Sequence, residues 1–173
     1  HTSYIGVTGV QTCALPILHH LRQQGHHREG VPNRSLADYV ARVREPLVLK
    51  GIACAEDAAL AVENGVDVVY VSNHGGRQLD QGRGTLDMLP EVARAVGGRA
   101  KVVVDGGVLR GTDVLKALAL GADAVGIGRM QGMALAAGGT AGVVRMLELL
   151  ETIGRVAATD ASVLVMGSLG PPG

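Results

Sequence analysis

A histidine and an arginine stand three residues apart, separated by two glycines, in the segment Ser72-Asn73-His74-Gly75-Gly76-Arg77. Histidine can exchange a proton near neutral pH, and a guanidinium can bind an anion through two parallel hydrogen bonds. The largely apolar residues 66–71 predict a buried strand, so both side chains follow the carboxyl end of a strand. Ligands of parallel α/β proteins bind at this end, which makes His74 and Arg77 candidate site residues. The alternative is a glycine-rich turn with a solvated arginine and a capping histidine.

Glycines and another arginine follow the next two predicted strands. Asp105-Gly106-Gly107 closes the third strand, and Gly128-Arg129 closes the fourth. Glycines let backbone N–H groups approach an anion closely, and the arginine adds a fixed positive charge. A phosphate site built from the last two loops that follow strands is a recurrent feature of the (β/α)8 barrel. These residues therefore indicate a phosphate site, the alternative being that the glycines only permit tight turns.

The elements that position these residues alternate regularly from residue 46 onward. Strands are predicted at 47–51, 66–72, 101–105 and 122–127, and helices at 55–63, 86–96, 112–120 and 139–150, with a shorter helix near 36–43. Pro90 is expected near the first turn of its helix. The order helix end, glycine, any residue, aspartate, strand occurs twice, at residues 64–69 and 120–125. Such repeats indicate successive right-handed βα units in one parallel sheet.

Four βα units make about half of an eight-unit barrel, which typically needs about 250 residues. We therefore expect an α/β half-barrel at residues 35–150, in a fragment of a longer protein. Residues 1–34 are expected to be a non-native or disordered leader, since residues 7–17 are similar to the translation of a DNA-sequencing adapter. Residues 151–173 are expected to be a divergent tail. The histidine pairs of the leader lack acidic or cysteine partners, so no metal site is predicted.

The composition narrows the classes of protein and partner. The 173 residues carry no formal net charge, 47% are hydrophobic and 18% are charged, as in a soluble globular protein. The neutral charge, the three Tyr and the absence of Phe and Trp argue against a nucleic-acid partner. No apolar run is expected to be long enough to span a membrane. Cys13 and Cys54 have neither disulfide nor metal spacing, and a cytoplasmic location is expected.

Four blocks of the sequence resemble, in the correct order, the FMN-dependent 2-hydroxy acid oxidase and dehydrogenase family, which includes glycolate oxidase, lactate oxidase and mandelate dehydrogenase. The blocks are Pro46–Gly51, Val71–Asp80, Asp105–Leu118, and Gly121–Arg129 with Ala136-Ala137-Gly138-Gly139 after it. The resemblance covers residues 35–150, the carboxyl-terminal half of that family's TIM (β/α)8 barrel. It implies FMN as cofactor and the oxidation of a small L-2-hydroxy acid to the 2-oxo acid.

The resemblance also implies roles for individual residues. His74 matches the base, Arg77 matches the residue that binds the substrate carboxylate, and Lys50 matches the residue that stabilises negative charge on the reduced flavin. These three would be the catalytic residues. The residues that would hold the cofactor are Lys50 and Ser72 at the ring, Asp105, Gly106, Gly107, Gly128 and Arg129 around the phosphate, and Arg110 as a further contact.

The chain departs from the family at Leu109, where the first of two arginines is usual, and at Met130, where many relatives have proline. The first half-barrel, which supplies further flavin and substrate contacts, cannot be located. We therefore expect this chain alone to bind FMN weakly or not at all, to have no useful turnover, and to self-associate through free sheet edges. The parent protein is expected to be a homo-oligomer.

Two alternatives stay open. Another FMN- or phosphate-binding barrel, such as an isomerase or a nucleotide dehydrogenase, would share the glycine-rich phosphate segments but would not need His74 and Arg77 at this spacing. A non-catalytic half-barrel would only associate with partners. The sequence does not identify the 2-hydroxy acid, nor whether oxygen, a quinone or a cytochrome accepts the electrons.

Overall fold

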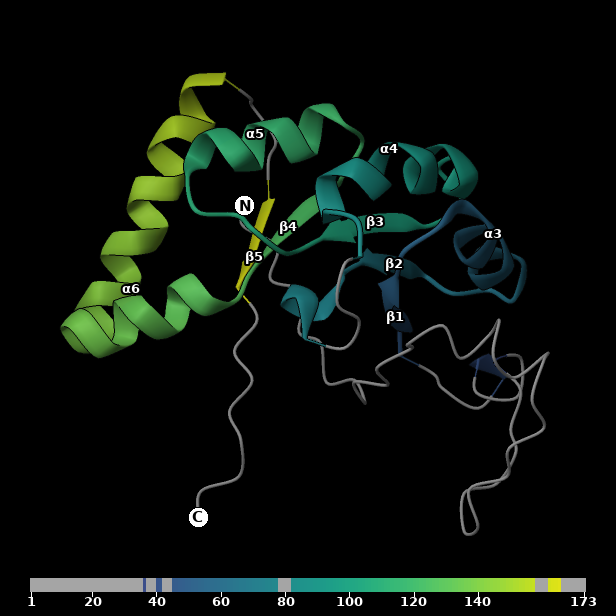
Figure 1. Cartoon of the computed structure of the whole chain (residues 1–173), viewed down its shortest axis with the longest axis horizontal. Helices are drawn as coiled ribbons and strands as arrows, with labels where there is room; N and C mark the ends of the chain where they lie inside the picture. The colour runs from purple at the N-terminus through teal and green to yellow at the C-terminus, as the bar shows by residue number, and fades with distance from the viewer. Residues whose placement is uncertain (1–35, 37–39, 42–44, 78–81, 158–161, 166–173) are drawn as a thin grey trace, which may run out of the picture.

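The computed structural model describes residue 36 and residues 40–41, 45–77, 82–157 and 162–165 of the chain (Figure 1). Strands and helices alternate along it, with one short 3-10 helix, η1. The elements are β1 Val48–Ile52, α3 Ala55–Glu63, β2 Val68–Val71, η1 His74–Gly76, α4 Thr85–Val96, β3 Lys101–Val104, α5 Gly111–Ala119, β4 Ala124–Ile127, α6 Arg129–Ala157 and β5 Ser162–Val165. The expected leader and residues 158–161 and 166–173 of the expected tail lie outside the described residues.

The strands form one parallel sheet in the order β1-β2-β3-β4-β5, which is also their order along the chain. A doubly wound sheet reverses its strand order part-way, whereas a barrel adds each strand beside the one before it. The predicted run of βα units in one parallel sheet is therefore confirmed. The sequence pattern does not predict β5, which lies beside β4. Of the described strands, β1 and β5 have a neighbour on one side only.

The predicted boundaries differ from the structure mainly at the last helix. This helix, α6, begins at Arg129 rather than at residue 139. Its glycines hide the start in the sequence, because glycine has a low helix propensity. Pro90 lies in the second turn of α4 rather than near its first turn, and the Leu86 carbonyl therefore lacks its usual helical donor. Of the short helix predicted near residues 36–43, only residues 36, 40 and 41 are described.

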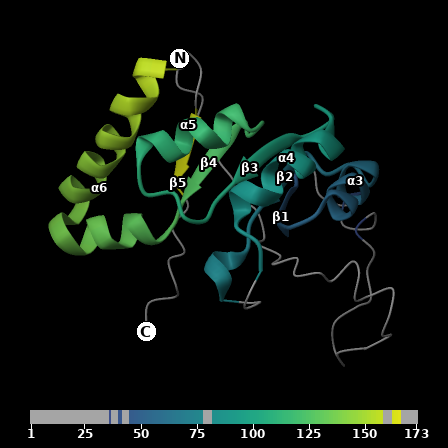
Figure 2. The ribbon, with the colours of Figure 1, turned by 45° about the horizontal axis from the view of Figure 1, so that its top comes forward.

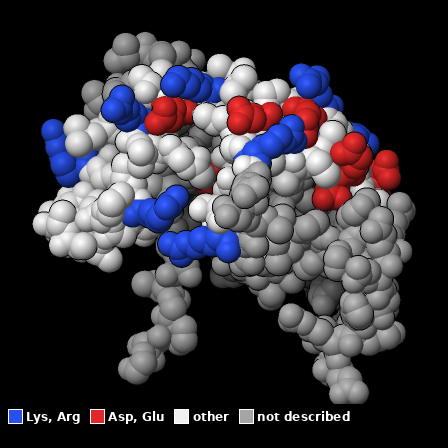
Figure 3. Space-filling model, viewed as in Figure 1, with Lys and Arg blue, Asp and Glu red and all other residues white. Residues whose placement is uncertain are grey.

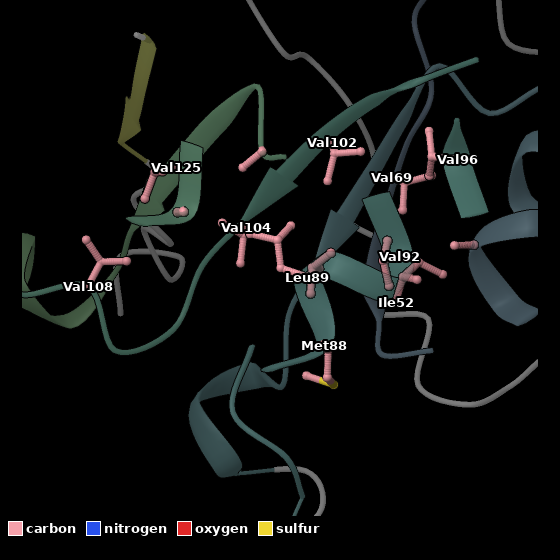
Figure 4. Packing of buried hydrophobic residues seen from close by; sticks show 14 of the residues in the cluster. Ile52, Val69, Met88, Leu89, Val92, Val96, Val102, Val104, Val108 and Val125 are labelled. Atoms are coloured by element: carbon pink, nitrogen blue, oxygen red, sulfur yellow. The ribbon is translucent and has the colours of Figure 1, made fainter. Parts of the chain in front are cut away.

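Helices α3, α4 and α5 cover one face of the sheet, as both views of the ribbon show (Figure 1 and Figure 2). Strand residues point into this layer, where Val104 packs near Leu89 of α4 and Val69 lies near Val92 and Val96 of the same helix (Figure 4). All five are fully buried, and the layer consists of aliphatic side chains and Met. Successive strand residues face opposite sides of a sheet. Tyr70 and Val103 are buried too, but they lie outside this helix-side cluster.

Helix α6 is broken in the middle, where Gly138 (φ −154°, ψ 21°) and Gly139 (φ 57°, ψ −147°) leave the helical conformation. Figure 1 shows the two arms at an angle to each other. Gly142 permits their close approach, since a methyl group added to it would overlap the carbonyl oxygen of Ala134. Residues Arg129–Glu151 are long and apolar enough to cross a membrane by length and composition alone, which corrects the expectation that no such run exists. The break divides this segment into two shorter arms.

Charged side chains of both signs are mixed on the surface. In Figure 3, Lys and Arg lie among Asp and Glu over the helix-covered part of the molecule. Exposed ion pairs join Lys101 to Asp123 and Arg145 to Glu148. The described part of this face therefore carries no uniform field of one sign.

The repeated sequence segment has a structural explanation at the amino-terminal end of the sheet. Asp67 Oδ2 accepts a hydrogen bond from Leu47 N at 2.8 Å, and Asp123 Oδ2 accepts one from Val102 N at 2.8 Å. The backbone amides of the two aspartates donate in return to the Leu47 carbonyl at 3.2 Å and the Val102 carbonyl at 2.7 Å. Each aspartate thus fastens the start of its own strand to the strand before it.

Asp123→Ala should lower the free energy of unfolding by about 1–3 kcal/mol, because the part-buried amide of Val102 loses its acceptor. Urea unfolding followed by circular dichroism measures the change. Lys101 is exposed and pairs with the other carboxylate oxygen of Asp123, so Lys101→Met is the control and should have a much smaller effect. Equal effects of the two substitutions would contradict the fastening role of the aspartate.

Candidate active site

The residues that the sequence singled out come from the carboxyl ends of four adjacent strands. Lys50 lies within β1, two residues before its carboxyl end, Ser72 directly follows β2, Asp105 directly follows β3, and Arg129 begins α6 just after β4. In a parallel sheet these ends share one edge. The side chains therefore converge although they are far apart in the sequence.

The ammonium group of Lys50 is the centre of the cluster. Its Nζ atom lies 2.8 Å from Asp105 Oδ2 and donates a hydrogen bond to Ser72 Oγ at 2.6 Å. It also lies 4.7 Å from the centroid of the Tyr70 ring, within the range of a cation–π interaction. The side chains of Lys50 and Asp105 are only 15% and 20% exposed, so salt screens this pair less than a surface pair. One positive charge thus joins β1, β2 and β3.

Two local hydrogen bonds hold His74 in a strained turn. Its φ of 54° lies in the left-handed region, which residues other than glycine rarely adopt. The Asn73 side chain accepts a hydrogen bond from Gly75 N at 2.9 Å, and the His74 amide donates to Ser72 Oγ at 3.2 Å. Gly75 and Gly76 follow with φ of 68° and 74°, a conformation that glycine adopts at little cost. Backbone strain of this kind is typical of functional sites.

The imidazole of His74 is placed to accept a proton. Its Nε2 atom is buried and has no hydrogen-bond partner among the described residues. Burial lowers the pKa of His74 below its ordinary value of 6.5, the positive charge of Lys50 lowers it further, and the negative charge of Asp105 opposes the shift. The neutral imidazole therefore predominates at neutral pH, with a nitrogen lone pair available for an incoming proton.

The loops that follow β2, β3 and β4 approach one another over the cluster. A methyl group added to Gly75 would lie 3.5 Å from Arg129 Nη2, so this guanidinium lies close to the His74 turn. A methyl group added to Gly106 (φ 97°) would lie only 3.1 Å from Thr85 Oγ1, which itself donates to the Gly106 carbonyl at 3.2 Å. Glycine at position 106 therefore permits the close approach to Thr85, whereas a methyl group at position 75 would make only an ordinary contact with Arg129.

Tyr70 belongs to the cluster, although the sequence pattern assigns it no role. Its hydroxyl is buried beside the Asp105 carboxylate, and no hydrogen bond of ordinary geometry joins the two. Burial raises the pKa of Tyr70, and the negative charge of Asp105 raises it further. The one sequence signal is a polar aromatic residue in an otherwise aliphatic strand, at the position that pairs with Lys50.

Other predicted site residues lie at the periphery of this cluster. Arg77 is exposed at the end of η1, next to residues 78–81, which fall outside the described part. Arg110 is exposed just before α5. Gly107 and Gly128 are exposed, and a methyl group added to either would meet nothing within 4 Å. The structure thus brings together the lysine, serine, histidine and carboxylate of the prediction, and it places the two arginines Arg77 and Arg110 outside their direct contacts.

Comparisons with known proteins identify relatives of the chain. A family model described as FMN-dependent dehydrogenase matches residues 18–154. An L-lactate oxidase of Nostoc sp. is 58% identical over 106 residues, covering 61% of this chain and 29% of that protein. The 2-hydroxyacid oxidase 1 of Mus musculus is 46% identical over 142 residues, covering 72% of this chain and 38% of that protein. A solved structure of mandelate oxidase with (S)-2-phenylpropionate has a TM-score of 0.68 and 50% identity, covering 70% of this chain and 36% of that one. The chain therefore spans well under half the length of these relatives.

In a pH titration followed by NMR, the imidazole resonance that His74→Gln removes should titrate below the ordinary pKa of 6.5. Between the folded and unfolded pKa values the folded chain then binds fewer protons, so the free energy of unfolding should fall as pH drops from about 6.5 through the folded pKa. His74→Gln should remove that part of the pH dependence. A resonance that titrates at or above 6.5 would contradict the described environment of this ring.

Proposed function

The chain belongs to the FMN-dependent dehydrogenase family, and from that premise we propose that its parent protein oxidises a small L-2-hydroxy acid to the 2-oxo acid. The described sheet is the carboxyl-terminal half of the family's TIM (β/α)8 barrel, about four βα units with parallel strands. The relatives support this substrate class, since they include an L-lactate oxidase and a mandelate oxidase.

The observation that carries the proposal is the buried, unpartnered Nε2 atom of His74 beside Lys50 and Asp105. Oxidation of a 2-hydroxy acid removes the α-hydrogen with two electrons and also releases the hydroxyl proton. A base must take a proton from the substrate, and a histidine with a lowered pKa is unprotonated before the reaction. The carboxylate of Asp105 offsets part of the shift, so the ring can still hold the proton that it receives.

The residues around the loops fit the phosphate end of FMN. The buried Asp105 Oδ1 is a hydrogen-bond acceptor, so it would bind a hydroxyl of the ribityl chain next to the phosphate and not the phosphate itself, which is also negative. Gly106 and Gly107 follow with φ of 97° and 76°. This conformation exposes backbone groups that a ligand can reach. Gly128 leaves open space before the guanidinium of Arg129, which would pair with phosphate oxygens.

The residues at the strand ends fit the ring end of FMN. When bound, FMN would take up the two electrons from the substrate. Lys50 would stabilise the negative charge that reduction creates, because its ammonium group is partly buried, where charges interact more strongly than in water. Ser72 Oγ accepts hydrogen bonds from Lys50 and from the His74 amide, so its own proton remains available for a ring atom.

Arg77 is the residue that we assign to the substrate carboxylate. It is exposed at the end of η1, three residues after His74, and its planar guanidinium can form two parallel hydrogen bonds with a carboxylate. Such a pair would fix the orientation of the substrate hydroxyl toward the imidazole. The same proposal includes a cytoplasmic location and a homo-oligomeric parent protein.

The alternative functions account for fewer of these features. An isomerase or nucleotide dehydrogenase with a phosphate-binding barrel would use the Asp105 and Gly128 loops in the same way. It would not require an unprotonated His74 beside the Lys50 cluster. A non-catalytic half-barrel would require neither the strained histidine turn nor the partly buried lysine.

A chimera tests the proposal in a complete barrel. Residues 46–150 of this chain would replace the matching segment of the Nostoc sp. L-lactate oxidase, with the unmodified oxidase as the positive control. We expect the chimera to bind FMN and to lose flavin absorbance under anaerobic conditions when L-lactate or another small L-2-hydroxy acid is added. His74→Gln in the chimera should retain FMN and slow this reduction by at least about 100-fold. Reduction that His74→Gln leaves unchanged, or an FMN-loaded chimera that no 2-hydroxy acid reduces, would contradict the proposal.

The chain by itself should bind FMN weakly or not at all and show no useful turnover. The chain spans well under half the length of its relatives, and among the described strands β1 and β5 each have a neighbour on one side only. Leu109 is also 58% exposed where the family usually has an arginine. Titration of FMN fluorescence measures binding, and anaerobic mixing with a panel of 2-hydroxy acids measures reduction. Robust flavin reduction by the chain alone would show this expectation to be wrong.

A further inference from the structure

Tyr70 is a buried polar residue that the proposed reaction does not use. Tyr70 is 1% exposed, and its hydroxyl makes no hydrogen bond of ordinary geometry in the described structure, although the Asp105 carboxylate is close enough to interact with it. A buried hydroxyl without a partner costs free energy, so its presence needs an explanation. Its neighbours Val69 and Val71 belong to the helix-side core and Tyr70 does not, which places its side chain on the other face of the sheet.

The side chain of Tyr70 reaches across the sheet from β2 to β4. Its ring lies against Lys50 of β1, with the ammonium nitrogen 4.7 Å from the ring centroid. Its hydroxyl lies over Gly126 of β4, where an added methyl group would overlap the oxygen. The same methyl group would lie 3.1 Å from the Cβ atom of Asp105, which follows β3. The side chain of Tyr70, on β2, therefore lies close to residues of β1 and β4 and to the residue that follows β3.

We propose that Tyr70 is a positioning residue for Lys50, and that residue 126 is a glycine because the Tyr70 hydroxyl occupies the space above it. Asp105 and Ser72 bind the ammonium group, and the Tyr70 ring face lies 4.7 Å from its nitrogen, so the ring limits the positions that the flexible lysine side chain can adopt. This inference depends on the proposed function in one respect only, namely that the ammonium group of Lys50 would face the flavin.

The chain has three lysines, Lys50, Lys101 and Lys116, so the environment of the first can be compared with two internal controls. The side chains of Lys101 and Lys116 are 70% and 66% exposed, against 15% for Lys50. Competitive acetylation of the full chain with acetic anhydride, read by mass spectrometry, should label Lys50 most slowly. Tyr70→Leu should raise the rate at Lys50 about fivefold or more, because the ring face is lost, and leave the other two unchanged. Tyr70→Phe keeps the ring and should preserve the protection.

The pattern over the three lysines separates positioning from general stability. A loosened fold would alter the controls as well, whereas a positioning role changes Lys50 alone and is rescued by phenylalanine. Equal Lys50 rates in the wild-type chain and in Tyr70→Leu, at a temperature where circular dichroism shows both to be folded, would overturn the proposal. Equal Lys50 rates in Tyr70→Phe and Tyr70→Leu would also overturn it.

Gly126 supplies a second test that leaves the ring in place. Gly126→Ala should displace the Tyr70 hydroxyl, lower the melting temperature and raise the labelling of Lys50. Gly128→Ala adds the same group where nothing lies within 4 Å, and this matched control should change neither quantity. If Gly126→Ala and Gly128→Ala give the same melting temperature and the same labelling of Lys50, the proposal is overturned. Should either Tyr70→Leu or Gly126→Ala fail to fold, the remaining one of these two variants decides the question.

None of these measurements uses FMN or a hydroxy acid. Failure of the proposed function is therefore recognised separately.

Discussion

The geometry of the site depends on the contacts that the ammonium group of Lys50 makes. It contacts Asp105 Oδ2 at 2.8 Å and Ser72 Oγ at 2.6 Å, so one charge connects the ends of three parallel strands. Ser72 in turn accepts the His74 amide, which links the lysine to the strained turn that carries the imidazole. The same positive charge favours the neutral form of that imidazole. Lys50 is thus linked to the histidine turn through Ser72, and its charge adds to burial, the larger cause, in lowering the pKa of His74.

The two faces of the sheet differ in how fully their buried side chains are paired with other groups of the described chain. On the helix-covered face, aliphatic side chains from the strands and from α3, α4 and α5 bury one another within this chain. On the opposite face and its carboxyl rim lie the buried side-chain atoms that lack hydrogen-bond partners among the described residues: the Tyr70 hydroxyl, His74 Nε2 and Asp105 Oδ1. Buried polar atoms are normally paired in native proteins. This half of the barrel therefore buries its own apolar core on the helix side, whereas its buried polar atoms lie together at the site.

The sequence predicted those features that depend on local periodicity or on strand order. Apolar runs located four strands, and glycine stops located the helix ends, because each signal lies within a few residues. The meeting of Lys50, Ser72, His74 and Asp105 followed from the shared edge of a parallel sheet. The role of Tyr70 could not be predicted, since it depends on a glycine two strands away. The start of α6 was hidden by its glycines, and β5 depends on where the chain returns to the sheet.

Asp67 and Asp123, at the amino-terminal end of the sheet, affect how the chain tolerates substitutions in its loops. Asp67 and Asp123 each latch one βα unit to its predecessor with contacts that involve no residue of the reactive rim. The contacts that hold the strands together thus lie at their amino-terminal ends, and the candidate site lies at their carboxyl ends. Loops at the carboxyl ends of the strands can therefore vary in sequence without breaking the aspartate hydrogen bonds. A βα unit can also be exchanged between homologous barrels together with the aspartate that binds it to the preceding strand.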